Sequence, residues 1–253
     1  MDTNIFASQK DFWSFVITFG ASPALLSLFL SSIVLIAFIG ALNRPFLIRA
    51  KGSIDSITTH LGHLASWAAL LMVLQQVIVV VMQSIFRLPE ITFGPFGIGF
   101  SATPSWFSEE LRLYNAFMIA LASAYTLHRG GHVRVDLVFA KLSYRMKRVF
   151  DIFGTLFLLY PLMITIYFFS WGYMWKSIAS ASVNVLKGRY SWRHWSLEAS
   201  TNPAGFNEIW IYKILIVVFS VLLMIQGLSI ILRCIQELQD GEPKSRNNLA
   251  KVH

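Results

Sequence analysis

Charged residues and cysteines are both scarce in this sequence. Only 13% of its 253 residues are charged, whereas a soluble domain usually has about 25%. The single cysteine, Cys234, excludes an internal disulfide and any metal site built from several cysteines. The chain also lacks a nucleotide-binding loop, an HExxH zinc motif and a GxSxG nucleophile motif. We therefore expect no enzyme, no resident cofactor and no ATP-driven motor.

The missing charges leave long uncharged stretches. Residues 12–43, 61–86, 152–175 and 214–232 contain no Asp, Glu, Lys or Arg. A helix rises about 1.5 Å per residue, so roughly 20 apolar residues cross the ~30 Å hydrocarbon core. A fifth stretch, 113–127, is shorter and needs its neighbours to complete a crossing. The pattern predicts an all-α integral membrane protein with five spans.

The junction between the first two spans is marked by a proline. The first span is expected over residues 23–42, and Pro45 should prevent the helix from continuing while it holds Arg44 extended. The polar segment 49–60 is then expected as a connection to the second span.

Polar residues elsewhere suggest local features of the other spans. Ser108 is expected to cap the third span, with acidic residues in its first turn. Pro161 should kink the fourth span. Gln75 and Gln226 lie deep in apolar runs, where interhelical hydrogen bonds are their expected role.

The loop 129–148 after the third span is strongly basic. It holds six Lys or Arg residues, and its apolar residues recur in steps of three and four, as on one face of a helix. Such a helix should lie flat among the lipid headgroups.

With five spans and the N-terminus outside, the inner segments hold thirteen basic residues and the outer segments six. Cytoplasmic loops collect Lys and Arg, so the C-terminus is expected inside. Basic cytoplasmic loops also account for the net charge of +8, so this charge need not indicate binding to nucleic acid.

A membrane bundle with paired histidines can hold haem. His60 and His63 precede the second span, and His128 and His132 follow the third. A haem within the bundle needs histidines that face each other at bilayer depth. These four lie at span ends, so we do not expect haem.

The order of motifs resembles one known family. Glu-Leu-Arg-Leu-Tyr at 110–114 is followed by Ala-Ser-Ala-Tyr-Thr-Leu at 122–127, by Gly-His-Val-Arg-Val-Asp at 131–136 and by the basic helix. This series is similar to the small membrane subunit of TRAP transporters, the tripartite ATP-independent periplasmic systems (DctQ-like family). The resemblance covers residues 53–238. It implies a four-helix unit there, preceded by an extension with one extra helix over 1–52 and followed by a polar tail over 239–253.

The resemblance also implies a function and partners. Such a subunit pairs with a large membrane subunit in the bacterial inner membrane. Together with a periplasmic binding protein they import an organic acid by sodium symport. The alternative is a membrane anchor for a redox or quinone-linked complex. The candidates for structural or assembly roles lie at or near the third span: Glu110, Tyr125, His132, Arg134 and Asp136.

Overall fold

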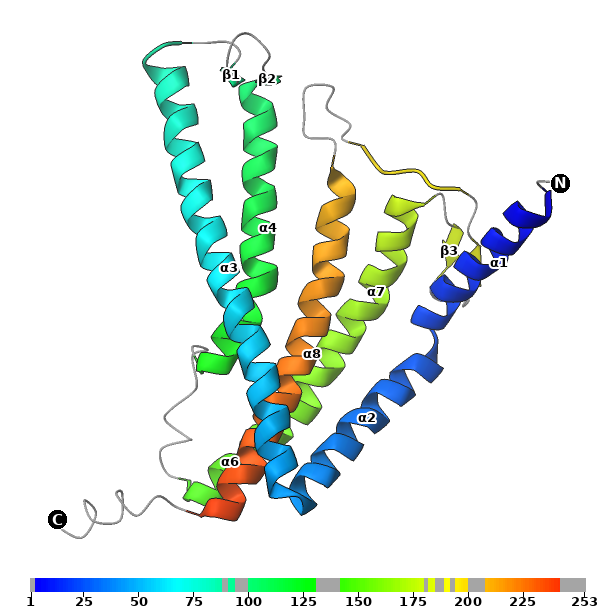
Figure 1. Cartoon of the computed structure of the whole chain (residues 1–253), viewed down its shortest axis with the longest axis vertical. Coiled ribbons are helices and arrows are strands. Elements are labelled where there is room, and N and C mark those ends of the chain that lie inside the picture. The colour runs from blue at the N-terminus through cyan, green and yellow to red at the C-terminus, as the bar shows by residue number, and fades with distance from the viewer. Residues whose placement is uncertain are drawn as a thin grey trace.

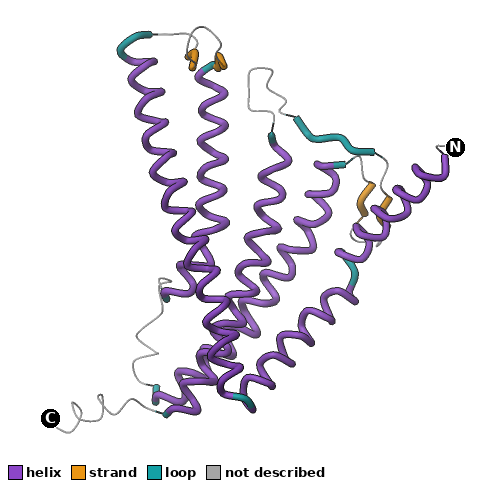
Figure 2. Tube along the Cα trace, in the orientation of Figure 1, coloured by secondary structure: helices purple, strands orange, loops and turns teal. Residues whose placement is uncertain are grey.

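The structure is a computed structural model that describes residues 3–87, 91–93, 100–130, 142–179, 182–184, 189–191, 194–199 and 208–241. Long helices make up nearly all of it (Figures 1 and 2). In chain order the elements are α1 (Thr3–Gly20), α2 (Pro23–Leu42), α3 (Arg44–Ser84), β1 (Ile91–Phe93), β2 (Phe100–Ala102), α4 (Pro104–Arg129), α6 (Tyr144–Gly154), the π-helical turn η2 (Thr155–Leu159), α7 (Tyr160–Ile178), β3 (Ser182–Asn184), β4 (Arg189–Ser191) and α8 (Ile209–Asp240).

The predicted all-α membrane fold is confirmed. Within the described residues, four continuous helices are long and apolar enough to cross a bilayer: α2, α3, α6 through α7, and α8. The strands are two antiparallel hairpins of three-residue strands at one end of the helices (Figure 2). The less apolar α4 has 26 residues, about 39 Å, and lies alongside α3. From α2 onward, α2, α3, α4, α7 and α8 run in alternating directions in Figure 1, as five successive spans would.

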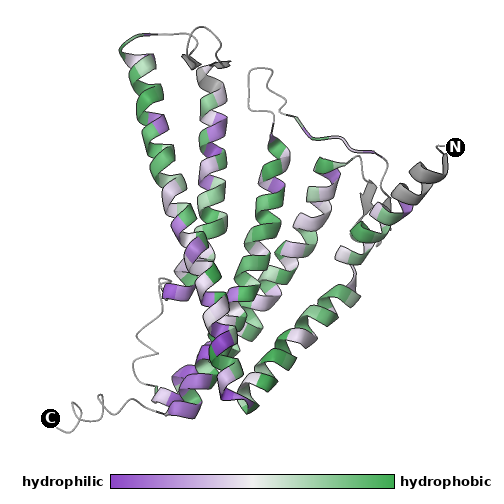
Figure 3. Cartoon of the chain, viewed as in Figure 1, coloured by the Kyte–Doolittle hydropathy of each residue, from purple (hydrophilic) through white to green (hydrophobic). Residues whose placement is uncertain are grey.

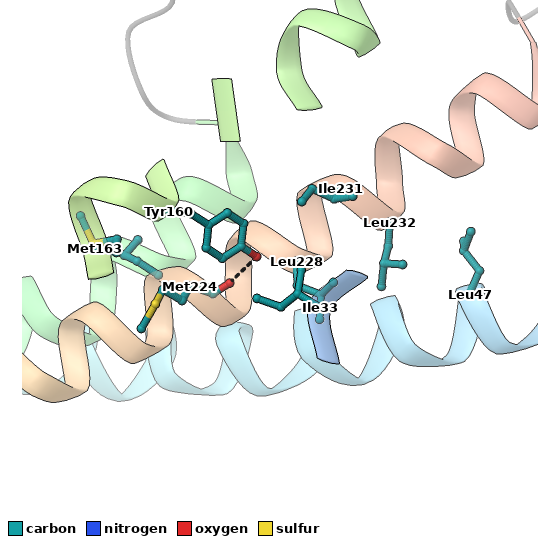
Figure 4. Close-up of a cluster of buried hydrophobic side chains, with 9 residues drawn as sticks. Ile33, Leu47, Tyr160, Met163, Met224, Leu228, Ile231 and Leu232 are labelled. Atoms are coloured by element: carbon teal, nitrogen blue, oxygen red, sulfur yellow. Dashed lines mark hydrogen bonds between the residues drawn. The ribbon is translucent and has the colours of Figure 1, made fainter. Parts of the chain in front are cut away.

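Helix α8 is the centre of the bundle. In the most apolar 18-residue stretch of α8, 56% of the residues are buried. In the corresponding stretches of the other three candidate spans, at most 17% are buried. One face of α8 packs on α2 and α3, and another packs on α7 (Figure 4). The buried side chains of this core are Ile33, Leu47, Tyr160, Met163, Leu223, Met224, Leu228, Ile231 and Leu232.

The polar ends of several helices meet at one end of the molecule, which we call the inner end. Figure 3 shows hydrophilic residues gathered where α3 begins and where α8 and α6 lie together. Ion pairs join Arg44 to Asp240 and Arg148 to Glu237, and Lys51 donates a hydrogen bond of 3.1 Å to Gln236. The predicted basic inner segments within the described residues therefore share one end.

An aromatic cluster packs at the opposite, outer end. The ring of Trp13 on α1 lies 5.7 Å from that of Trp175 on α7 and 4.9 Å from that of Trp195. Trp171 donates a hydrogen bond to the carbonyl oxygen of Ile17 at 3.1 Å. These contacts hold α1 and the segment 194–199 against the end of α7.

The structure corrects the expected junction between the first two spans. Asn43 is the extended residue, with φ −124° and ψ 94°, and α3 begins at Arg44 with Pro45 in its first turn. Proline is well suited to that place, because the first helical N–H groups have no partner within the helix. The predicted connection 49–60 is helical and belongs to α3.

The start of the third span and the basic helix also differ from the prediction. Helix α4 begins at Pro104 after Thr103, so Ser108 lies inside the helix and does not cap it. Gly130, in the left-handed region at φ 68°, ends α4, and α6 starts only at Tyr144. Residues 131–141 of the predicted amphipathic helix lie outside the described residues.

Beside Pro161, where the sequence predicts a kink, the structure has a π-helical turn. This turn, η2, directly precedes Tyr160, whose N–H bonds to the carbonyl of Thr155, five residues back. Proline has no N–H, so residue 161 cannot donate the backbone hydrogen bond that a regular α-helix would have there. The turn lies against Gly227 of α8, where a Cβ would stand 2.7 Å from Leu159 Cδ2.

Candidate functional site

A group of polar side chains joins α3, α4 and α8 near the inner end. We call it the Asp55 cluster. It consists of two residues from α3, one from α4 and three from α8: Asp55, Thr58, His128, Gln226, Ser229 and Arg233. Thr58, Gln226 and Ser229 are buried, and the side chains of Asp55 and His128 are only 15% and 17% exposed.

The Asp55 carboxylate is the common acceptor of the cluster. Its Oδ1 accepts hydrogen bonds from Ser229 Oγ at 2.5 Å and from Gln226 Nε2 at 3.3 Å. The Arg233 guanidinium lies 3.8 Å from Oδ2. These donors and the neighbouring cation provide the polar partners that a carboxylate largely removed from water requires.

Gln226 connects the cluster to a second position on α3. Its Oε1 accepts a hydrogen bond of 2.7 Å from Thr58 Oγ1, while its Nε2 donates to Asp55. The amide thus bonds to α3 at two positions one helical turn apart. This confirms the prediction that Gln226 forms interhelical hydrogen bonds.

His128 lies between a carboxylate and a guanidinium. Its Nδ1 is 3.1 Å from Asp55 Oδ1 and also 3.1 Å from Arg233 Nη2. A protonated Nδ1 donates to Asp55, and an unprotonated Nδ1 accepts from Arg233. Arg233 also donates to the backbone carbonyl of His128 at 3.3 Å. A protonated Nδ1 therefore connects α4 to α3, and an unprotonated Nδ1 connects α4 to α8.

A second charged group lies beside the Asp55 cluster. Arg148 on α6 pairs with Asp151 at 3.3 Å and with Glu237 on α8. A cavity of about 330 Å³ opens between these residues and the end of α4. Its lining residues are Leu127, Arg129, Gly130, Arg148, Asp151, Ile230, Arg233, Cys234 and Glu237.

The predicted site residue Glu110 bonds to a different part of α3. Its Oε2 accepts a hydrogen bond of 2.6 Å from Gln75 Nε2, and Tyr114 lies 3.4 Å from its Oε1. Gln75 therefore makes the interhelical bond predicted for it. Glu110 is 19 residues, about 28 Å, from the last residue of α4. It thus lies at the far end of α4 from the segment that carries the other predicted polar residues.

Tyr125 lies in the contact between α3 and α4. Its ring covers Gly62, and its hydroxyl accepts a hydrogen bond of 3.1 Å from Arg129 Nε. The Arg129 guanidinium is 5.4 Å from the ring centre. The remaining predicted candidates, His132, Arg134 and Asp136, lie outside the described residues.

An ion pair at the outer end fixes the segment 194–199. Glu198 pairs with Lys213 on α8 and accepts a hydrogen bond of 2.6 Å from Ser177 Oγ on α7. Two hydrogen bonds lower the pKa of Glu198 below its ordinary value of 4.5. The bond from Lys213 has the larger effect, and the bond from Ser177 has the next largest. The Glu198 backbone N–H also donates to the Ser177 carbonyl at 2.9 Å.

Sequence reasoning missed Asp55, Ser229 and Arg233 as members of one site. The sequence places Asp55 in a polar connection, whereas the structure places it on α3 with its carboxylate facing α8. One signal was available: Gln226 and Ser229 lie three residues apart in an otherwise apolar run, so they share one helix face. Polar residues on one face of a membrane helix indicate a polar partner on a neighbouring helix.

The fold and these clusters define a multi-pass membrane protein whose polar side chains bind its helices to one another. Residues 96–237, more than half of the chain, match the family model of the DctQ component of tripartite ATP-independent periplasmic transporters. The chain belongs to this family and is a small membrane subunit of the TRAP type. Neither a curated protein nor a solved structure matches it. The family match contains α4, α6, α7 and most of α8, and α2 and α3 precede it.

Proposed function

We propose that the chain is the fixed membrane scaffold of a sodium-driven TRAP transporter that imports an organic acid across the bacterial inner membrane. Its partners are the large membrane subunit and a periplasmic binding protein. The match over residues 96–237 to a TRAP component family carries this proposal.

A scaffold role is supported by polar bonds at several levels of the bundle. The Asp55 cluster joins α3, α4 and α8 near the inner end. Gln75 and Glu110 join α3 to α4 farther out, and Tyr212 Oη donates to the Glu109 carbonyl at 2.8 Å. Polar groups cross-linked in this way resist relative movement of helices, because each broken bond leaves a group unsatisfied in an apolar medium.

The wide apolar surfaces supply contact area for the large subunit and for lipid. On α3 the exposed residues include Trp67, Leu71, Leu74 and Ile78. We propose that the inner end faces the cytoplasm. The shared position of Arg44, Arg148 and Arg233 near that end agrees with the positive-inside rule.

His132, Arg134 and Asp136 are proposed as contacts for assembly with the large subunit. Asp136→Ala should then lower the yield of the complex more than Lys141→Ala, a neighbouring charge change in the same segment. Co-purification with a tagged large subunit measures this. Equal yields from both variants would reject the assignment.

Reconstitution tests the function directly. Proteoliposomes with both membrane subunits, supplied with the binding protein and an organic acid, should accumulate substrate only under an inward sodium gradient. Omitting this chain should abolish uptake. Uptake that persists without the chain, or that ignores sodium, would contradict the proposal. A haem-like visible spectrum of the purified complex would favour the redox-anchor alternative instead.

A further inference from the structure

A groove of about 410 Å³ lies between α3 and α4, in the halves of these helices that are nearer the outer end (Figure 1). Its wall on α3 is apolar and open to the surroundings, since Leu71, Leu74 and Ile78 are 43–54% exposed. Its wall on α4 includes the polar side chains of Glu110 and Tyr114. The groove therefore places a carboxyl group beside an exposed apolar surface.

The Glu110 carboxyl group lies at the depth of the hydrocarbon core. It accepts the hydrogen bond of 2.6 Å from Gln75 Nε2, so the two side chains share one level of the bilayer. Gln75 belongs to the uncharged stretch 61–86, and roughly 20 residues of that stretch cross the core. Every continuous segment of this length within 61–86 includes Gln75. Ionisable side chains at such depth are rare, and they usually pair with another charged group or serve a function.

No oppositely charged partner for Glu110 occurs among the described residues. The hydrogen bonds of its carboxyl group there come from Gln75 and Tyr114, which are both uncharged, and the second spans 3.4 Å. None of the ion pairs between described residues includes Glu110. Arg112 lies on the opposite side of α4, because residues two apart in a helix are separated by about 160° around its axis. The described part of the chain therefore supplies no cation to the groove.

The exposed wall of the groove fits a membrane helix. Leu71, Leu74 and Ile78 follow one another in steps of three and four, so they form a ridge along one face of α3. Single segments that cross the hydrocarbon core do so as helices. A neighbouring helix with Lys or Arg at the level of Glu110 would pack against the ridge and neutralise the carboxylate. An acyl chain can cover the ridge, but it brings no cation.

A second copy of this chain does not supply the cation in a two-fold dimer. The same surface of both copies meets in such a dimer. Glu110 would then approach Glu110 of the second copy, while Arg112 would stay on the opposite side of α4. A helix from a different chain is therefore required.

We propose that this groove receives a transmembrane helix of the large membrane subunit, and that a lysine or arginine of this helix forms an ion pair with Glu110. The identity of the partner chain rests on the proposed function. The carboxylate at hydrocarbon depth and the apolar ridge define the chemistry of its helix. Opposite charges attract more strongly there than at an exposed surface, because the surrounding medium has a low dielectric constant.

The dissociation constant between the purified full chain and the purified large subunit in detergent tests the ion pair. Glu110→Gln keeps an oxygen that can accept from Gln75 but removes the charge. It should raise the dissociation constant at least roughly tenfold, because the cation of the partner is left unpaired. Glu109→Gln is the matched control, since it removes a charge one residue away and outside the groove lining. It should leave the constant unchanged, and thermal melts of each variant alone verify that its fold is intact.

Photo-crosslinking tests the docking surface while Glu110 stays intact. Benzoylphenylalanine replaces either Leu71, in the groove, or Val73, which is also 54% exposed but lies outside the groove lining. In the assembled complex, position 71 should cross-link to a transmembrane segment of the large subunit that contains Lys or Arg. Position 73 should not.

Each other outcome overturns the proposal. An unchanged dissociation constant for Glu110→Gln, or an equal loss in both glutamate variants, would mean that Glu110 forms no ion pair with the partner. Cross-links from position 71 to a second copy of this chain, or equal cross-links from both positions, would reject the assigned occupant. If the wild-type chain failed to bind the large subunit at all, the proposed function would fail with the docking site. If it bound with the groove uninvolved, only the docking site would be rejected.

Discussion

The ring of Tyr125 lies against Gly62, so that a Cβ on residue 62 would stand 2.5 Å from the ring's Cγ. Real Cβ atoms do not approach other atoms so closely. The absence of a side chain at Gly62 is therefore what lets α3 and α4 meet here. Small residues at such contacts are how membrane helices gain van der Waals packing, since lipid gives them little hydrophobic drive to associate.

Gly62→Ala should destabilise the protein through this contact. Either the helices separate or the ring leaves its position, and overpacking of this kind costs about 1–3 kcal/mol. Thermal unfolding in detergent would show a lower Tm. Gly52→Ala is the matched control on the same helix, because a Cβ there meets nothing within 4 Å. That control should be neutral or slightly stabilising, as alanine favours helix over glycine. A Tm equally low in both variants would refute the packing explanation.

Asp55→Leu should be among the most destabilising single changes in the chain. It removes the acceptor for Ser229 and Gln226 and leaves Arg233 without its carboxylate. Breaking a largely buried ion pair costs about 3–5 kcal/mol. Denaturant titration, or loss of the monodisperse peak in size-exclusion chromatography, would report it.

Asp240→Leu provides the comparison for Asp55→Leu. Asp240 pairs with Arg44 at the surface, where the two side chains are 38% and 61% exposed. Exposed ion pairs contribute about 0–1 kcal/mol. If the two variants lost similar stability, the Asp55 cluster would not be the structural centre described above.

The sequence predicts the spans well and the bonds between them poorly, for a physical reason. A lack of charge over some 20 residues is a property of one segment, so α2, α7 and α8 could be located from local sequence. The bond between Asp55 and Ser229 joins residues 174 positions apart, and no local pattern encodes it. Gln75 and Gln226 were recognisable as hydrogen-bonding residues because an amide in an apolar run needs a partner. Which partner it finds depends on how α3, α4 and α8 pack.

Tyr160→Phe should weaken the contact of α7 with α8. The Tyr160 hydroxyl donates a hydrogen bond of 3.1 Å to the Met224 carbonyl, and its side chain is 2% exposed (Figure 4). Loss of the hydroxyl should cost about 0.5–1.5 kcal/mol. Tyr173→Phe removes the same group from an α7 side chain that is 60% exposed, and it should leave the Tm within error. A larger loss from Tyr173→Phe would contradict the assignment.

Glu198 should make stability at the outer end depend on pH. Its pKa is lowered in the folded state by hydrogen bonds from Lys213 and Ser177. A lowered carboxyl pKa contributes stability above the unfolded value, and this contribution is lost as the pH falls through the folded value. The effect of Glu198 should therefore be complete at pH 7 and should decline below about pH 4.5. Thermal melts followed by tryptophan fluorescence from pH 7 to pH 3 measure it.

Glu198→Gln isolates this contribution. The variant should melt below the wild type at pH 7, and the difference should shrink as the pH falls below 4.5, because protonation makes the wild-type side chain uncharged as well. Ser177→Ala removes one of the two donors and should give a smaller difference with the same direction of pH dependence. If the wild type and Glu198→Gln kept a constant separation down to pH 3, the ion pair with Lys213 would not be what holds the segment 194–199 against α7 and α8.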